Sequence, residues 1–160
     1  MLKYVNHDIV FQEFPDEVAL AVNLSGCPHR CPGCHSAWLQ GDTGEELTEE
    51  RLLALLDDYR GEVTCVGLMG GDADPAGVAR LLAAVKRRYG GALRTGWYSG
   101  GERLPEAFRP EAFDYVKLGP WRAALGPLSS PRTNQRLYRV GPDGALADIT
   151  ARLRRPAAGQ

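Results

Sequence analysis

The chain has 160 residues, of which 44% are hydrophobic and 24% charged, and its formal net charge is −1 at pH 7. These values favour one soluble domain with a sizeable core, and the near-zero charge gives no bulk attraction to nucleic acid or to an anionic membrane. Because no apolar segment approaches the length of a membrane span and the N-terminus lacks a signal-peptide pattern, we expect no nucleic-acid or membrane partner.

Segments typical of strands and of helices alternate along the chain. Apolar runs predict strands at residues 18–24, 63–69, 93–99, 115–118 and 137–140. Apolar residues at helical spacing predict one helix over 49–59, begun by the N-cap Thr48, and a second from Pro75 to Gly90. The first residues, Lys3 to Phe14, are expected to form a short hairpin that covers one edge of the sheet.

This order of elements predicts an α/β fold. Strands joined by crossover helices usually lie parallel, so the glycine-rich breaks fall at the C-terminal strand ends, where such sheets bind ligands. A full eight-unit barrel needs about 250 residues, and we therefore expect a partial, open barrel with a mostly parallel, curved sheet. Residues 1–150 are predicted to be a single domain, and residues 151–160 a flexible C-terminal tail with solvated arginines.

Three of the four cysteines lie in one short segment, Cys27-Pro-His-Arg-Cys31-Pro-Gly-Cys34, called here the cysteine loop (residues 27–34). Structural zinc and ordinary iron-sulfur clusters both take four protein ligands. Three thiols spaced Cys-x3-Cys-x2-Cys can instead hold three corners of a [4Fe-4S] cluster and leave the fourth iron open to a small molecule. Free thiolates fit a reducing cytoplasm, where we expect the protein to be located. Cys65, in an apolar run, is predicted to be a small buried hydrophobe.

A zinc site is the alternative interpretation of these cysteines. The three thiols would then need a fourth ligand, for which His29 and His35 are the candidates. The protein would in that case be a non-catalytic zinc-binding module that recognises a partner. This alternative assigns no role to the downstream motif Gly70-Gly71-Asp72.

The cysteine spacing resembles the radical S-adenosylmethionine (SAM) superfamily, and residues 26–35 are closer still to the glycyl-radical activating enzymes. Gly70-Gly71-Asp72 resembles the superfamily's glycine-glycine-acid motif. Residues 133–138, Thr-Asn-Gln-Arg-Leu-Tyr, resemble the tail of anaerobic ribonucleoside-triphosphate reductase activating proteins. The resemblance extends over roughly residues 5–140. It implies a single radical SAM-type domain over residues 1–150, folded as an open radical-SAM β/α barrel.

The resemblance also implies how the cofactors bind. Cys27, Cys31 and Cys34 would hold a [4Fe-4S] cluster, whose fourth iron takes the amino and carboxylate groups of SAM. Gly33 would contact the adenine of SAM through its backbone. That position is often aromatic in the superfamily, so ring packing on adenine is expected from elsewhere, with His35 and Trp38 as candidates.

The glycine-glycine-acid motif is expected to bind the amino-acid part of SAM. Gly70 and Gly71 would let the backbone pass close to the ligand, and the carboxylate of Asp72 would accept hydrogen bonds from the α-ammonium. The superfamily more often has glutamate at the third position, so the shorter aspartate requires a closer approach. Asp74 is a second carboxylate that could serve, or could cap the next helix.

Two later residues are further candidates for SAM binding. Ser99, at the end of the third strand, would bond the ammonium, the carboxylate or the ribose. Lys117 would approach the carboxylate if it faces the cavity; otherwise it is a solvated charge on an edge strand. Whether Asn134 and Arg136 contact SAM, a partner or only the fold is left open.

The implied reaction is reductive cleavage of SAM, followed by removal of a hydrogen atom from a glycine Cα of a partner protein. The partner would be anaerobic ribonucleoside-triphosphate reductase, and the electron donor a small protein such as flavodoxin. A short, open barrel suits a large substrate, because a loop of the partner can close the open side. The alternative within the same superfamily is a small-molecule substrate, as in deazaguanine synthesis.

Overall fold

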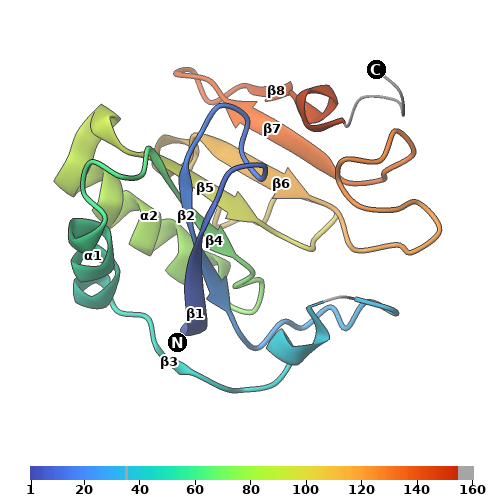
Figure 1. The fold of residues 1–160 in the computed structure, drawn as a ribbon, viewed down its shortest axis with the longest axis horizontal. Helices are drawn as coiled ribbons and strands as arrows, with labels where there is room; N and C mark the ends of the chain where they lie inside the picture. Colours follow the sequence, from blue (N-terminus) through green and yellow to red (C-terminus); the bar gives the residue numbers. More distant parts are fainter. Residues whose placement is uncertain (35, 155–160) are drawn as a thin grey trace.

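One open sheet organises the computed structural model, which describes residues 1–34 and 36–154. Within these residues the sheet has eight strands in the order β3-β1-β2-β4-β5-β6-β7-β8 (Figure 1). In chain order they are β1 (Lys3–Val10), β2 (Ala19–Leu24), β3 (Glu45–Glu46), β4 (Cys65–Met69), β5 (Arg94–Tyr98), β6 (Tyr115–Leu118), β7 (Arg136–Val140) and β8 (Leu146–Asp148). The α/β class and an open sheet are confirmed.

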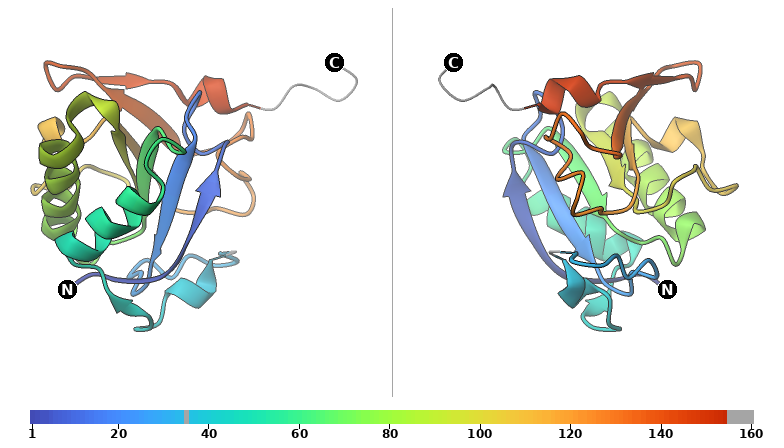
Figure 2. Two further views of the ribbon diagram at one scale, coloured as in Figure 1. Left: turned by 60° about the vertical axis from the view of Figure 1, so that its left-hand side comes forward. Right: turned by 90° about the vertical axis from the view of Figure 1, so that its right-hand side faces the viewer.

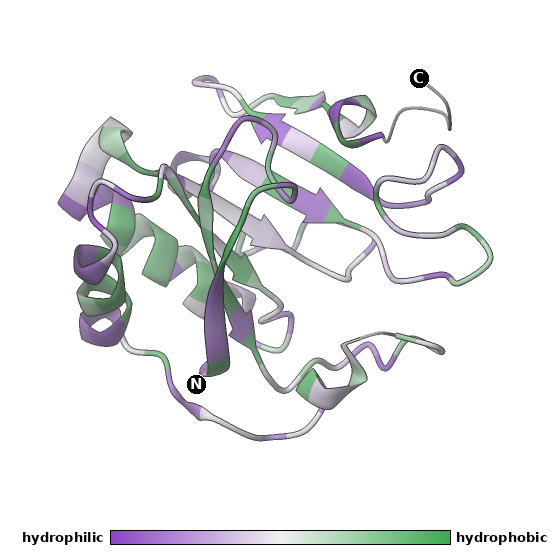
Figure 3. Ribbon diagram, viewed as in Figure 1, coloured by the Kyte–Doolittle hydropathy of each residue, from purple (hydrophilic) through white to green (hydrophobic). Residues whose placement is uncertain are grey.

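The centre of the sheet is parallel and its two sides are antiparallel. Strands β2, β4, β5 and β6 pair parallel to one another. On one side β1 and β3 add antiparallel strands, and on the other β7 and β8 do so. The expected hairpin at residues 3–14 is therefore a single strand, β1, paired with β2. Hydrophilic residues are interspersed with hydrophobic ones along β1 (Figure 3), which suits a strand that is nowhere fully buried.

Two helices cover one face of the sheet, α1 (Glu49–Asp58) and α2 (Pro75–Tyr89) (Figures 1 and 2). Thr48 caps α1 by accepting from the Arg51 N–H at 3.1 Å, as predicted. The carboxylate of Asp74 caps α2 through the Gly77 N–H at 3.0 Å. The segment between β5 and β6 contains only a 3-10 turn among its described elements, although those two strands are parallel.

Side-chain alternation along the strands separates the two faces of the sheet. Apolar side chains at alternate positions of the central strands form the main core together with α1 and α2. These strand members of the core are Leu20, Val22, Leu24, Val66, Leu68, Trp97, Val116 and Leu118. Because the side-chain period of a strand is two, the intervening residues face the side of the sheet opposite the helices.

Two rows of residues cross the opposite face of the sheet. In the row near the C-terminal strand ends, backbone pairing aligns Asn23, Met69, Tyr98 and Lys117 on four successive strands. The next row is made of small residues and ends in a tyrosine: Ala21, Gly67, Gly96 and Tyr115. These two rows therefore make up the face of the sheet opposite the helices.

The small row makes room for Phe14, which follows β1 and is only 1% exposed. A Cβ added at Gly67 or Gly96 would lie 2.6 Å or 2.4 Å from the Phe14 ring, so both strands need glycine there. The ring also packs against Tyr98 and Tyr115, with centroid distances of 5.2 and 5.3 Å. Phe14 thus covers this row of small residues on the face of the sheet opposite the helices.

The last described residues pack beside Phe14. Residues 150–153 form the 3-10 turn η4 (Thr150–Leu153), Leu153 packs on the cluster around Phe14, and Arg152 pairs with Asp16. The remainder of the expected tail, residues 155–160, lies outside the described part of the chain. Within the described residues, none of the helices has both the length and the apolar character needed to cross a membrane.

Candidate functional site

A cavity of about 1050 Å³ lies on the face of the sheet opposite the helices, at the C-terminal ends of the parallel strands. The three thiols of the cysteine loop line it, together with Asp72 after β4 and Lys117 on β6. The sequence placed these residues at this edge of the sheet, and the structure brings them to one cavity. Its volume is at the upper end of the range usual for small-molecule sites.

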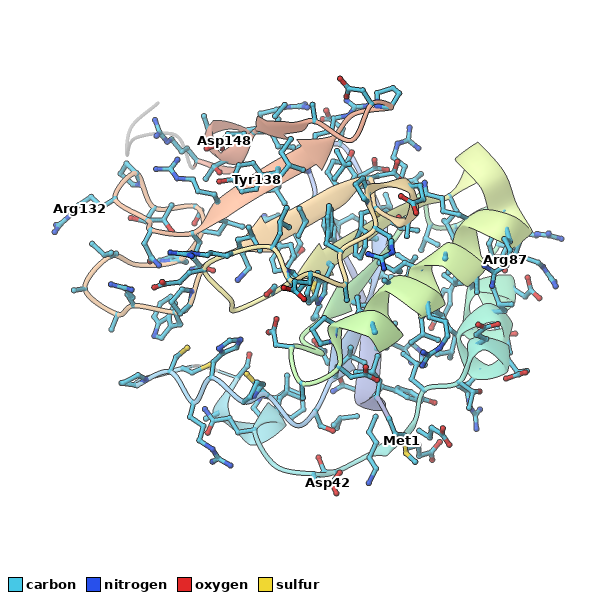
Figure 4. All side chains as sticks on the ribbon, turned by 180° about the vertical axis from the view of Figure 1, so that it is seen from behind. Met1, Asp42, Arg87, Arg132, Tyr138 and Asp148 are labelled. Carbon is cyan, nitrogen blue, oxygen red and sulfur yellow. The ribbon has the colours of Figure 1, made fainter. Side chains whose placement is uncertain are left out.

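The cysteine loop is tied to the segment that follows it. The N–H groups of Gly26 and Cys27 donate to the carbonyls of Gly41 and Leu39, at 3.0 and 3.2 Å. The Ser36 N–H donates to Cys34 Sγ at 3.4 Å, a contact that stabilises a thiolate. Figure 4 shows yellow sulfur atoms along the light-blue loop, beneath the orange segment between β6 and β7.

Of the two histidines considered as a fourth metal ligand, the structure describes only His29. His35 lies outside the described residues. His29 has its Nε2 at 3.3 Å from Asp72 Oδ2, so its ring links the cysteine loop to the acidic residue after β4. Among the residues that the structure describes, no three His, Cys, Asp or Glu side chains are grouped so that they could hold a single metal ion.

Asp72 is the most strongly held carboxylate of the site, and its side chain is 9% exposed. Its Oδ1 accepts from the Ser99 hydroxyl, and its Oδ2 accepts from the Gly100 N–H at 3.0 Å and faces His29. A carboxylate offers about four acceptor positions, so these three contacts leave one for a ligand. Asp72 is therefore fixed in place and still able to bind a cation.

Ser99 has a different position from the one expected. The sequence predicted Ser99 as a direct contact of the ligand, but it is 2% exposed and is not among the described residues that line the cavity. Its hydroxyl donates to Asp72 and accepts from the Gly101 N–H at 2.9 Å. Ser99 therefore orients the carboxylate of Asp72.

Of the two glycines before Asp72, one borders the cavity and the other packs against the apolar core. Gly70 has φ +106° and lines the cavity, and its carbonyl accepts from the Trp97 indole N–H at 2.6 Å. Gly71 has φ +90°, and a Cβ there would lie 2.7 Å from Val78 and 2.9 Å from Leu24. Both backbones are in the left-handed region that favours glycine. Gly71 is thus required by the core beneath the site, and Gly70 borders the cavity itself.

Lys117 is buried inside the cavity wall, with 7% of the residue exposed. Because β7 and β8 continue the sheet, β6 is not an edge strand, and the alternative of a solvated Lys117 is excluded. Its Nζ donates to Gly119 O and Gln135 Oε1, both at 3.0 Å, and lies 5.5 Å from the centre of the Tyr98 ring. Two of its three N–H groups are used, which leaves one for a ligand.

Burial lowers the pKa of Lys117 from 10.5 to about 8, against the opposing attraction of Asp72 and the three thiols. The folded protein therefore binds fewer protons than the unfolded chain between these two pH values, and the free energy of unfolding rises with pH across this window. The rise expected from a shift of this size is about 3 kcal/mol. We predict that the Lys117→Met variant lacks this rise in the free energy of unfolding. Denaturant unfolding of the wild type and the variant from pH 7 to pH 11 measures it. An equal rise in the variant would contradict the assignment to Lys117.

In the Thr-Asn-Gln-Arg segment, residues 133–136, the first three residues make contacts beside the cavity and the fourth does not. Gln135 accepts from Lys117, and Thr133 Oγ1 holds the Gln135 N–H at 3.0 Å. Asn134 donates to the Pro120 carbonyl at 3.1 Å, next to the cavity. Arg136 lies on β7 and its guanidinium is 3.7 Å from the carboxylate of Asp148, away from the cavity lining.

Trp121 is a cavity residue that the sequence interpretation missed. It follows β6 and lines the same cavity as the cysteines, and its indole Nε1 lies 3.7 Å from where a Cβ on Gly33 would be. Trp38, one of the two aromatic candidates from the sequence, is 51% exposed and is not part of the described cavity lining. Cys65, as predicted, is fully buried, and burial raises the pKa of its thiol.

Comparisons with known proteins agree with the cysteine motif. Two curated proteins described as anaerobic ribonucleoside-triphosphate reductase-activating protein, from Salmonella typhi and Salmonella typhimurium strain LT2, are each 39% identical to this chain over 70 residues. The matched region is 40% of this chain and 45% of each relative, so the chain spans less than half the length of these relatives. No solved structure matches the chain.

A family described as a 4Fe-4S single cluster domain matches residues 18–116. This region contains the cysteine loop, strands β2, β4 and β5, both helices, and Asp72. The resemblance to iron-sulfur activating proteins that the cysteine spacing indicated is thereby confirmed. Because the match extends over more than half of its residues, the chain belongs to the 4Fe-4S single cluster domain family.

Proposed function

We propose that this protein is a radical SAM activating enzyme, which uses a [4Fe-4S] cluster and SAM to generate a glycyl radical on anaerobic ribonucleoside-triphosphate reductase. The observation that carries the proposal is the common cavity of three thiols, a fixed carboxylate and a buried ammonium. Family membership supports the cluster, and the names of the matched relatives support the reductase as target. The finer expectation of a radical-SAM barrel is part of the same proposal.

The three thiols of the cysteine loop fit a [4Fe-4S] cluster that takes only three ligands from the protein. Cys27, Cys31 and Cys34 would hold it, and the Ser36 N–H at Cys34 Sγ would stabilise the negative charge of that thiolate. A fourth cysteine of the described chain, Cys65, is enclosed in the apolar core and cannot reach the site. The cavity beside the cysteine loop has room for a ligand of the size of SAM.

The two charged groups of the cavity suit the amino-acid part of SAM. Asp72 would accept a hydrogen bond from the α-ammonium through its remaining acceptor position, and Lys117 would donate to the carboxylate. A buried ammonium with a lowered pKa is costly for the fold, and such groups are concentrated at functional sites. Lys117 is thus best explained as a ligand-binding group.

The residues of the chain would bind, orient and shield the reactants. The bound cofactors supply the chemistry, a one-electron reductive cleavage of SAM that leads to abstraction of a glycine Cα hydrogen. Ser99, His29 and the Gly100 N–H hold Asp72, and Gln135 holds Lys117, so both contacts are set before the ligand arrives. The Phe14 ring is buried over Gly67 and Gly96 and fills that part of the sheet face.

Activation of the reductase tests the proposal directly. The reconstituted protein, a reductant, SAM and the purified reductase are combined without oxygen, and the doublet of a glycyl radical is sought by electron paramagnetic resonance. We expect the radical together with 5'-deoxyadenosine, and expect neither without the activating protein. Turnover of a deazaguanine precursor in the absence of the reductase would favour the small-molecule alternative. One zinc ion without labile sulfide in the active preparation would overturn the proposal.

A further inference from the structure

We propose that Trp121 provides the aromatic surface on which the adenine of SAM packs. This inference rests on the proposed function, because it takes SAM to be the ligand of the cavity. The residue just before the last cysteine of this chain, Gly33, has no side chain that could pack on adenine. The ring would therefore come from the segment after β6.

The backbone of the cysteine loop explains why residue 33 carries no ring. Gly33 has φ +70°, in the left-handed region where any residue with a Cβ is strained. The nearest heavy atom to a Cβ built there is the indole Nε1 of Trp121, at 3.7 Å. The indole thus lies on the side of the loop toward which a side chain at position 33 would project.

Trp121 is held in this position by its neighbours in the chain. The Gly119 N–H donates to the Gly101 carbonyl at 2.7 Å, and the Asn134 side chain donates to the Pro120 carbonyl at 3.1 Å. Directly after Trp121, the Arg122 guanidinium pairs with Glu102 at 2.9 Å. Contacts on both sides thus hold the backbone of the segment that carries the indole before a ligand binds.

The other aromatic rings of the described cavity lining are less suited to adenine. Tyr98 lies beneath the Lys117 ammonium at 5.5 Å, and its hydroxyl donates to the Glu13 carbonyl, so it belongs to the charged part of the site. Phe11 is in the loop before β2 and is 68% exposed. The His29 imidazole, also in the lining, is directed to Asp72 at 3.3 Å, whereas Trp121 lies next to the residue that precedes Cys34.

This arrangement gives the Asn-Gln part of the segment before β7 two separate tasks. Gln135 positions Lys117 for the amino-acid part of the ligand. Asn134 positions the backbone immediately before Trp121 for the adenine part. Asn134 is therefore a positioning residue, and Trp121 is the residue that touches the ligand.

The test measures equilibrium binding of SAM and of methionine to the cluster-loaded protein and its variants. Methionine has the same amino and carboxylate groups but no adenine. Aromatic stacking on a base suggests that Trp121→Ala binds SAM roughly 5- to 100-fold more weakly, with methionine binding unchanged. Trp121→Phe should stay within about threefold of the wild type, whereas Trp121→Leu, which keeps apolar bulk without a ring, should resemble the alanine variant. Trp38→Ala is the matched control and should bind both ligands normally.

The outcomes separate this inference from the proposed function. If the wild type binds SAM and Trp121→Ala and Trp121→Leu bind it equally well, the inference is overturned and the proposed function stands. Equal weakening of SAM and methionine binding in both variants, at unchanged cluster content, would assign Trp121 to the architecture of the site and overturn the inference as well. Absence of SAM binding by the cluster-loaded wild type would overturn the proposed function itself.

Discussion

Replacing Cys27, Cys31 or Cys34 with alanine is expected to abolish reductive cleavage of SAM while leaving the fold intact. Each thiol lines the cavity from a loop and is partly exposed, so its removal leaves the core unchanged. A cluster that has lost one of three protein ligands has no substitute in the described chain, because the fourth cysteine is buried elsewhere. The measurement is 5'-deoxyadenosine formation after anaerobic reconstitution, with circular dichroism as the check on folding.

Cys65→Ala is the matched control for these three variants. Cys65 is fully buried beside Phe14, so its loss should reduce the free energy of unfolding by about 1 kcal/mol through the small cavity created. Its iron and sulfide content and its SAM cleavage should remain those of the wild type. Retained cleavage in any of the three loop variants, or loss of the cluster in Cys65→Ala alone, would contradict the proposed ligand set.

Asp72→Asn is expected to weaken SAM binding by roughly 100-fold, because it removes the one negative charge proposed to face the α-ammonium. The amide preserves size, and its single oxygen can accept from the Gly100 N–H while its NH2 group donates to the Ser99 hydroxyl oxygen, so the site should keep its shape. The loss should therefore appear in SAM affinity, with the cluster retained. Binding titrations of the cluster-loaded variant measure it.

Asp74→Asn is the matched control for the Asp72 variant. The sequence left Asp74 as a second candidate carboxylate, but in the structure it caps α2 and lies 3.6 Å from the N-terminal amine. Asparagine is also a good N-cap, so this variant should lose little stability and no SAM affinity. Equal affinity losses in the two variants would show that Asp72 has no special role.

The order of the elements and the position of the site were predictable from the sequence, because both follow from local patterns. Apolar runs broken by glycine gave the parallel strands, and the N-cap Thr48 and the first-turn residue Pro75 gave the helix starts. The edge strands β3 and β8 were not predicted, since two or three residues carry no periodic pattern. Lys117 could be taken for a residue of an edge strand because the sequence does not show that β7 pairs with β6.

The contacts within the site were less predictable, because they join residues far apart in the chain. Nothing near Ser99 indicates that its hydroxyl is bound to Asp72, 27 positions earlier. The position of Trp121 depends on Asn134 and on the turn after β5, so it could not be read from local sequence. One signal was available and was not used: Gly67 and Gly96 within two strands indicate a close neighbour, which is Phe14.

The central claim is that the chain holds a [4Fe-4S] cluster with one iron open to SAM. Electron paramagnetic resonance of the anaerobically reconstituted, reduced protein, recorded with and without SAM, tests this claim most directly. The account predicts the signal of a reduced [4Fe-4S] cluster, and a clear change in that signal when SAM is added. A folded protein that forms no cluster, or a cluster whose signal is the same with and without SAM, would contradict it.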